Sequence, residues 1–382
     1  MGLQLVLGRA GSGKTHLCLE QIVNSVEESP IGPPLILLVP EQATFQMERA
    51  LLEALSAPAV IRAQVLSFRR LAWRILQQSG GASRPPLTEL GKRMILRKLI
   101  QAHREELGIF GRLGRHGGFI EGLSRTITEM RSYRINPLDL AGREGDDALS
   151  RKLHDLAMIL GQYDSHLRDR FTDPDEYLTV AANRLAGAGL DGCLIWVDGF
   201  AGFTPQELEM LGRLFVIARQ ATVTLCLDSR EVGKEDSLFR PTSETYIQLL
   251  RLAAEQKVKI HPPIELAGQR RFCFPELAYL EGEYPKRTGK AWDGPCHGTT
   301  LVRAPHPMGE VEGAAREILR LVSEEGFRFR QIAVILRDIE PYAPLIRAAF
   351  QDYQIPYFLD ERRSVAHHPL VELVRSALEV VL

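Results

Sequence analysis

The sequence has almost no net charge. Its 47 lysines and arginines and 48 aspartates and glutamates leave −1 at pH 7 over 382 residues. No global positive field therefore draws the chain to nucleic acid, and any DNA contact must come from local grooves and particular side chains. Long apolar runs are missing too, since none approaches the ~18 residues that a membrane span needs. The N-terminus lacks the charged and apolar regions of a signal peptide. We therefore expect a cytoplasmic protein without a membrane segment.

Cysteine is scarce, internal repeats are absent, and no low-complexity tract occurs. The five cysteines form no C-x-x-C pair, and most lie in apolar stretches: Cys18, Cys193, Cys226, Cys273 and Cys296. This pattern argues against a disulfide framework or a zinc site and favours reduced thiols.

Short apolar runs alternate with helical periodicity in much of the chain. We expect strands at 3–7, 35–39, 59–65, 192–197 and 221–227, and helices at 16–26, 45–55 and 68–77. Strands that alternate with helices predict an α/β fold with a parallel sheet covered on both faces.

The periodicity also predicts the domain organisation. Residues 1–85 and 188–275 are expected to form one sheet domain, interrupted at 86–187 by an insertion that is helical almost throughout. Residues 276–299, with proline, glycine and charge, are expected to be a linker. A second α/β unit is expected at 300–382, with helices at 310–324 and 342–351 and strands at 332–336 and 356–359. Because an apolar helix runs to the last residue, we expect a longer polypeptide of which this is the first portion.

A phosphate-binding motif follows the first expected strand. The pattern G-x-x-x-x-G-K-[ST] is met at every fixed position by Gly8, Arg9, Ala10, Gly11, Ser12, Gly13, Lys14 and Thr15. Glycines let successive N–H groups face a phosphate, and the following helix adds its positive end. Lys14 would reach the β- and γ-phosphates of ATP, and the Thr15 hydroxyl would ligate Mg²⁺. A P-loop that no longer binds nucleotide is the alternative.

A second carboxylate is needed to hold Mg²⁺, and Asp198 supplies it after the apolar run at 194–197. In active motors the next residue is normally a glutamate that positions the attacking water. Here it is Gly199, and loss of a positioned base commonly costs ~10²–10⁴-fold in rate. We therefore expect a site that holds ATP and turns it over slowly or not at all.

The order of these segments resembles superfamily 1 helicases of the UvrD type. Residues 8–15 match their first motif, residues 39–43 (VPEQA) their second-strand motif, and residues 67–74 (SFRRLAWR) their T-F-H-x-L-x-x-R segment. Asp198 stands in for the first residue of D-E-x-x-D, and Arg337 ends a run similar to their γ-phosphate-sensing segment. The glutamine element that reads adenine is missing, and only 227–230 (LDSR) stands where G-D-x-x-Q is usual. The resemblance implies a RecA-like P-loop domain, a helical insertion and the start of a second RecA-like domain.

Within that superfamily the chain is most similar to the AddB (RexB) family, on residues 8–15, 38–44, 61–76 and 196–207. This resemblance implies the N-terminal part of a helicase/deoxyribonuclease subunit that works in double-strand break repair by homologous recombination. It implies an AddA-type motor as partner in a heterodimer, and a helicase-like region that is degenerate as a motor and scans single-stranded DNA for the Chi signal. A nuclease with an iron–sulfur cluster belongs to the far C-terminus of such subunits, and nothing here matches it.

By position, the resemblance implies strand contacts at Gln42, Thr44, Phe68, Arg70 and Trp73. Polar side chains beyond a strand can bond base edges, aromatic rings can stack on bases, and arginine can pair with phosphate. Alternatives stay open: Phe68 and Trp73 as helix core, Gln42 and Thr44 as caps of the next helix, and the arginines at 69, 70 and 74 as a solvated face. Phe200 and Phe203, just past Asp198, are further candidates for contact with the same DNA strand.

Two other functions compete with this interpretation. One is a self-sufficient P-loop ATPase or small-molecule kinase, although the second α/β unit argues for a two-domain motor layout. The other is a true helicase whose base comes from elsewhere, for which Glu207 is the nearest downstream carboxylate.

Overall fold

The computed structural model describes residues 2–55, 62–80, 84–114, 116–141, 145, 147–168, 170–268, 270–286, 289–361 and 368–381. The chain divides into two compact units, Met1–Pro295 and Cys296–Leu382. No helix among the described residues has the length and apolar character to cross a membrane.

A parallel seven-stranded sheet organises the first unit. The strand order is β3–β2–β4–β5–β1–β6, with β7 also paired to β1. The strands are β1 (Gly2–Gly8), β2 (Leu35–Leu38), β3 (Ala63–Leu66), β4 (Leu194–Val197), β5 (Gln220–Cys226), β6 (Lys259–Ile260) and β7 (Ile264–Leu266). The expected parallel α/β sheet is confirmed; of the third expected strand, residues 59–61 lie outside the described residues.

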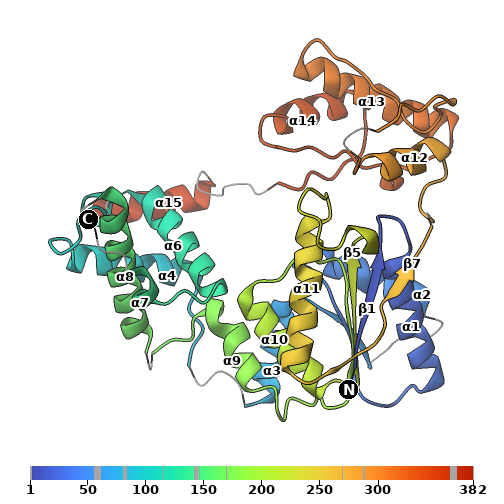
Figure 1. Cartoon of the computed structure of the whole chain (residues 1–382). Helices are drawn as coiled ribbons and strands as arrows, with labels where there is room; N and C mark the ends of the chain where they lie inside the picture. Colours follow the sequence, from blue (N-terminus) through green and yellow to red (C-terminus); the bar gives the residue numbers. More distant parts are fainter. Residues whose placement is uncertain are drawn as a thin grey trace. The chain divides into compact units, whose positions relative to one another are not determined.

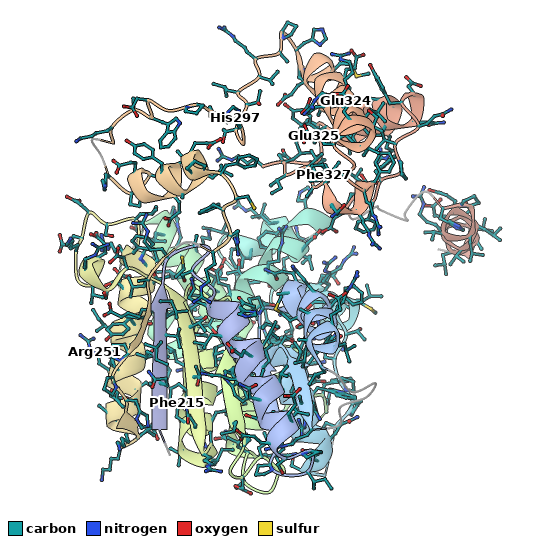
Figure 2. The ribbon with its side chains drawn as sticks, turned by 90° about the vertical axis from the view of Figure 1, so that its right-hand side faces the viewer. Phe215, Arg251, His297, Glu324, Glu325 and Phe327 are labelled. Atoms are coloured by element: carbon teal, nitrogen blue, oxygen red, sulfur yellow. The ribbon has the colours of Figure 1, made fainter. Side chains whose placement is uncertain are left out.

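Helices cover both faces of this sheet because the strand side chains alternate between two cores. Leu35 and Leu37 of β2 pack under α1 (Lys14–Glu28) and α2 (Thr44–Ala54), whereas Ile36 and Leu38 join the larger core on the other face. That face carries α3 (Phe68–Gln78), α9 (Tyr177–Asn183), α10 (Pro205–Ile217) and α11 (Arg240–Glu255) (Figure 1). Figure 2 shows the buried Phe215 of α10 and the exposed Arg251 of α11.

The expected helical insertion contains α4 (Glu89–Ala102), α5 (Phe110–Leu113), α6 (Gly117–Ser132), α7 (Pro137–Ala141) and α8 (Ala148–Leu167). These helices enclose a core of their own. The end of the expected insertion differs, because Ala181 and Ala182 of α9 and Leu185 pack into the core of the sheet. The chain therefore returns to the core of the sheet domain before residue 187, where we expected the insertion to end.

An ion pair made by a buried lysine links the helical insertion to the turn before α9. Lys92 of α4 is 2% exposed, and its ammonium donates to the Thr128 hydroxyl at 2.6 Å and to the carboxylate of Asp175. The carbonyl of Asp175 in turn accepts from the Gln206 side chain at 3.0 Å. One polar cluster thus joins α4, α6 and α10.

A helix also begins inside the segment expected to be a linker. α12 (Pro275–Glu283) follows β7, and its Glu276 is buried. This part of 276–299 is therefore ordered structure of the first unit. Short 3-10 turns complete the description at Glu41–Ala43, Pro174–Glu176, Ser229–Glu231 and Phe329–Gln331.

The second unit is helical in its described residues. α13 (Pro307–Glu324) and α14 (Ala343–Asp352) pack on each other around Ile318 and Phe350, and α15 (Pro369–Val381) follows. The helices expected at 310–324 and 342–351 are confirmed. The strands expected at 332–336 and 356–359 are wrong, since the described residues of this unit contain no strand. A strand requires a hydrogen-bonded neighbour, which an apolar run by itself does not supply.

Candidate functional site

The motif at residues 8–15 forms the turn between β1 and α1. Gly13 caps α1 with φ 94°, a left-handed conformation that glycine adopts without steric cost. The Lys14 ammonium lies over the loop and donates to the carbonyls of Gly8 at 2.7 Å and Arg9 at 2.8 Å. Burial lowers the pKa of Lys14 from its usual value, and nearby Asp198 opposes that shift. The loop thus presents a partly desolvated cation at its centre.

Asp198 contacts this loop although it lies 183 positions after Thr15 in the chain. Register explains the meeting: Val197 of β4 lies opposite Val223 of β5, so Asp198 is level with Thr224. The Thr15 hydroxyl donates to the Asp198 carboxylate at 2.7 Å, and the Thr224 hydroxyl donates to its other oxygen. Since Asp198 is buried, these two hydroxyls satisfy a carboxylate that water hardly reaches. The structure therefore brings together the two groups that the sequence assigned to Mg²⁺.

The backbone conformation at Gly199 shows that this position lacks more than a glutamate side chain. Its φ is 84°, and a Cβ built there lies 3.3 Å from Cδ of Pro40. The backbone at this position therefore favours glycine itself. Glu207, the nearest downstream carboxylate, accepts from the N–H of Thr204 at 2.8 Å in the capping box that begins α10. Its carboxylate is thus engaged in holding a helix end.

A cavity of about 640 Å³ opens over the loop, and Lys14, Thr15 and Asp198 line it. Arg270 and Arg271 line it as well, and the backbone N–H of Arg270 donates to the Gly11 carbonyl at 2.9 Å. Sequence reasoning missed both arginines because they lie far along the chain from any motif. The doublet of adjacent arginines at 270 and 271 was the available sign. Together with Lys14 they give the cavity three cationic side chains, which suits a polyphosphate.

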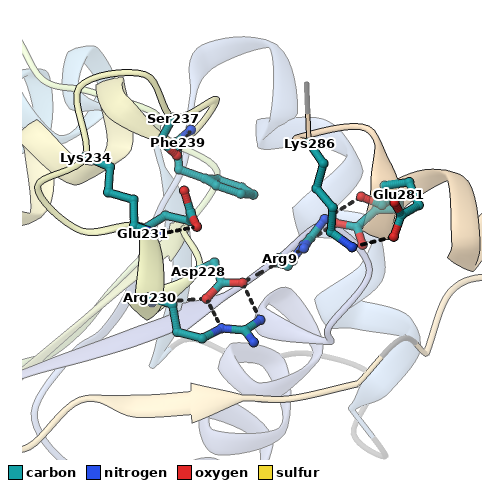
Figure 3. Close-up of polar contacts among 10 residues, drawn as sticks. Arg9, Asp228, Arg230, Glu231, Lys234, Ser237, Phe239, Glu281 and Lys286 are labelled. Carbon is teal, nitrogen blue, oxygen red and sulfur yellow. Dashed lines mark hydrogen bonds and ion pairs between the residues drawn. The ribbon is translucent and has the colours of Figure 1, made fainter. Parts of the chain in front are cut away.

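Arg9, at a variable position of the motif, connects the loop to two other segments (Figure 3). Its Nε donates to the Glu281 carboxylate of α12 at 2.9 Å, and its guanidinium lies 3.9 Å from the Asp228 carboxylate. Asp228 follows β5 and also accepts from Arg230 at 3.0 and 2.8 Å. These bonds to Arg230 lower the pKa of Asp228 below its usual range. The loop is thereby held to α12 and to the end of β5.

The residues expected to contact DNA separate into buried and exposed groups. Phe68 is 6% exposed and packs edge-on against Phe200, with ring centroids 5.5 Å apart, and against Phe203 at 6.1 Å. Phe68 therefore occupies the helix-core position that was its alternative. Thr44 is also buried, and its hydroxyl donates to the Glu41 carbonyl at 2.9 Å. Capping of α2 by Thr44 is wrong, because the N-cap is Ala43 and no side chain caps it.

The other three expected contacts are exposed. Trp73 on α3 is 57% exposed, so a place in the helix core is wrong for this residue. Arg70 lies one turn before it and donates to Glu48 of α2 at 2.7 Å. Gln42 is exposed in the turn after β2. Arg337 belongs to the second unit and is exposed there, and its role as a phosphate sensor stays a prediction.

Comparisons with known proteins show one family. The family described as ADDB, N-terminal, matches residues 5–281. The whole chain is 50% identical to the B-type subunit of the ATP-dependent helicase/deoxyribonuclease of Moorella thermoacetica and 48% identical to that of Symbiobacterium thermophilum. It is 39% identical to the protein of the same name from Bacillus thuringiensis. The chain covers 34% of each of these relatives and thus spans about a third of their length.

Proposed function

Because the chain belongs to the AddB family, matched through its N-terminal region, we propose that it is the helicase-like part of a helicase/deoxyribonuclease subunit. In this proposal its partner is an AddA-type motor subunit and its substrate is single-stranded DNA. The strand is scanned for the Chi signal during double-strand break repair by homologous recombination. Nuclease chemistry and an iron–sulfur cluster are assigned to the part of such subunits that lies beyond this match.

The proposal includes ATP and Mg²⁺ binding at a RecA-like P-loop. One observation carries it: the Thr15 hydroxyl and the Asp198 carboxylate meet at 2.7 Å under a cavity lined by Lys14. Hydroxyl and carboxylate oxygens suit Mg²⁺, which also keeps several waters and phosphate ligands. A bound Mg²⁺ would neutralise phosphate charge, while Lys14, Arg270 and Arg271 contact the phosphates.

Hydrolysis at this site is proposed to be slow. Gly199 carries no carboxylate, and Glu207 is engaged in a helix cap. Neither residue therefore offers a general base beside Asp198, which supports a nucleotide-holding role over that of a motor. Steady-state ATP hydrolysis stimulated by single-stranded DNA at the rate of a translocase would refute this part and favour the true-helicase alternative.

Single-stranded DNA is proposed to bind near the ends of β2 and β3. Trp73 offers an exposed ring for stacking, Arg70 a guanidinium for phosphate, and Gln42 an amide for a base edge. Phe68 and Thr44 are proposed to support this surface from beneath, since both are buried.

The experiment is a titration of the purified chain with labelled single-stranded oligonucleotides of varied sequence across a salt series. Arg70→Ala/Trp73→Ala is compared with Arg151→Ala, an exposed arginine of α8, as control. Loss of sequence-dependent binding in the double variant alone supports the proposal. Stacking of ~1–3 kcal/mol per base predicts affinity about fivefold weaker or more. Equal binding by all three proteins, repeated in a complex reconstituted with the motor subunit, would show that these residues do not contact DNA.

A further inference from the structure

A second cavity, of about 340 Å³, adjoins the one over the phosphate loop. Ala10 of the loop and Cys226 at the end of β5 line both cavities. Otherwise the second cavity differs in chemistry, because apolar and aromatic side chains make up most of its wall. They include Leu238, Phe239, Phe272, Leu280 and Tyr284.

The wall of this apolar cavity is fastened to the phosphate loop. Arg9 of the loop donates to Glu281 of α12 at 2.9 Å, and α12 contributes Leu277 and Leu280 to the cavity. On the other side, the Arg9 guanidinium lies 5.6 Å from the centre of the Phe239 ring (Figure 3). Arg9 therefore fixes both Phe239 and α12 relative to the residues proposed to bind phosphate.

We propose that this apolar cavity receives the base of the nucleotide whose phosphates bind the loop, an inference that rests on the proposed nucleotide binding. A nucleoside triphosphate needs a cationic site for phosphate and a flat apolar site for its base, one ribose apart. The two adjoining cavities supply these chemistries in that order. The rings of Phe239, Phe272 and Tyr284 provide stacking surface, and every base has a face that can stack.

The lining also determines the selectivity of this base site. Discrimination between bases requires polar groups that bond their edges. Among the lining residues that the structure describes, the polar side-chain groups are the Glu281 carboxylate, which is bonded to Arg9, the weakly bonding Cys226 thiol and the exposed Tyr284 hydroxyl. ATP and GTP are therefore expected to bind with affinities within about threefold of each other, since stacking tolerates either base.

The test compares ATP, GTP and inorganic tripolyphosphate by calorimetry on the full chain with Mg²⁺. Leu280→Asp places a carboxylate in the base site at a residue that is already 53% exposed, so folding is preserved. Leu90→Asp, at an exposed leucine in the first turn of α4, is the matched control. Wild type and Leu90→Asp should bind ATP about tenfold or more tightly than tripolyphosphate. Leu280→Asp should lose that advantage and bind tripolyphosphate as wild type does. Tyr284→Ala, at another exposed lining residue, should lower ATP affinity in the same direction.

The outcomes separate this inference from the proposed function. If wild type binds ATP and tripolyphosphate equally, or Leu280→Asp and Tyr284→Ala bind ATP like wild type, the base site is refuted while phosphate binding stands. A clear preference for one purine also refutes the unselective stacking site. If wild type binds neither ligand, the nucleotide site itself is wrong and the base site falls with it.

Discussion

Gly199→Glu tests whether this site is a motor that has only lost its catalytic glutamate. The substitution restores the Asp-Glu pair of an active P-loop motor directly after β4. If a missing side chain were the only defect, phosphate release should rise by ~10²–10⁴-fold, the usual contribution of a positioned base. The structure predicts otherwise, because the backbone at Gly199 has φ 84°.

The cost of the substitution follows from that conformation. A residue with a Cβ pays about 1–2 kcal/mol in the left-handed region. Pro40 must also shift by a few tenths of an ångström, since its Cδ lies 3.3 Å from the added Cβ. We expect Gly199→Glu to lower the free energy of unfolding by about 1–2 kcal/mol, which corresponds to a fall in Tm of roughly 2–4 °C. Because the backbone at residue 199 has a conformation that favours glycine, we expect the new carboxylate not to be positioned as a general base. Phosphate release should therefore change by less than about threefold, far below the contribution of a positioned base.

The assay pairs thermal melting with phosphate release under saturating ATP and Mg²⁺. Gly202→Glu is the matched control, because this glycine lies in the same exposed loop and is not among those with positive φ. A Cβ there meets only the Thr245 hydroxyl at 3.5 Å, an ordinary contact. The control should melt as wild type does. If Gly199→Glu also melts as wild type does and gains ~10²-fold or more in hydrolysis, our account of the loop is wrong.

Three further predictions concern the carboxylates and the buried lysine. Asp198→Asn should weaken ATP binding about tenfold with Mg²⁺ and much less in EDTA, because the lost charge faces the metal; equal losses in calorimetry under both conditions would contradict this. Lys92→Met should lower the free energy of unfolding by about 3 kcal/mol, the lower end of the range for a buried pair, because it leaves the Asp175 carboxylate, whose side chain is 12% exposed, without its cation. Hydrogen exchange across α4 and α6 measures this, with the exposed Lys152→Met as control, and an equal effect of both would contradict it. The pKa of Asp228 is lower in the folded than in the unfolded chain, so its contribution to stability is complete above about pH 4 and is lost as the pH falls through the lowered value. Between pH 5 and pH 3 the Tm of wild type should thus fall more than that of Asp228→Asn, and parallel curves would contradict the pairing with Arg230.

Local features of this protein were predictable from its sequence, because periodicity and motif chemistry act over a few residues. The strand–loop–helix around Lys14 is where the pattern placed it, and Asp198 ends a buried strand as its apolar run indicated. The apolar run at 332–336 was not sufficient to predict a strand. A strand forms only where a second strand lies beside it, and the residues of the run do not specify that neighbour.

Only the tertiary structure decided which distant groups share a site. The strand order sets β5 between β4 and β1, and this order brings Asp198 to Thr15. The segment after β7 passes the phosphate-binding loop, so Arg270 and Arg271 line the same cavity as Lys14. Exposure was likewise undecided by sequence, because Phe68 and Trp73 lie on one helix yet only Phe68 faces the core. A pattern determines which side chains can pack or bind, but strand order and register determine their neighbours, and those depend on the whole sheet.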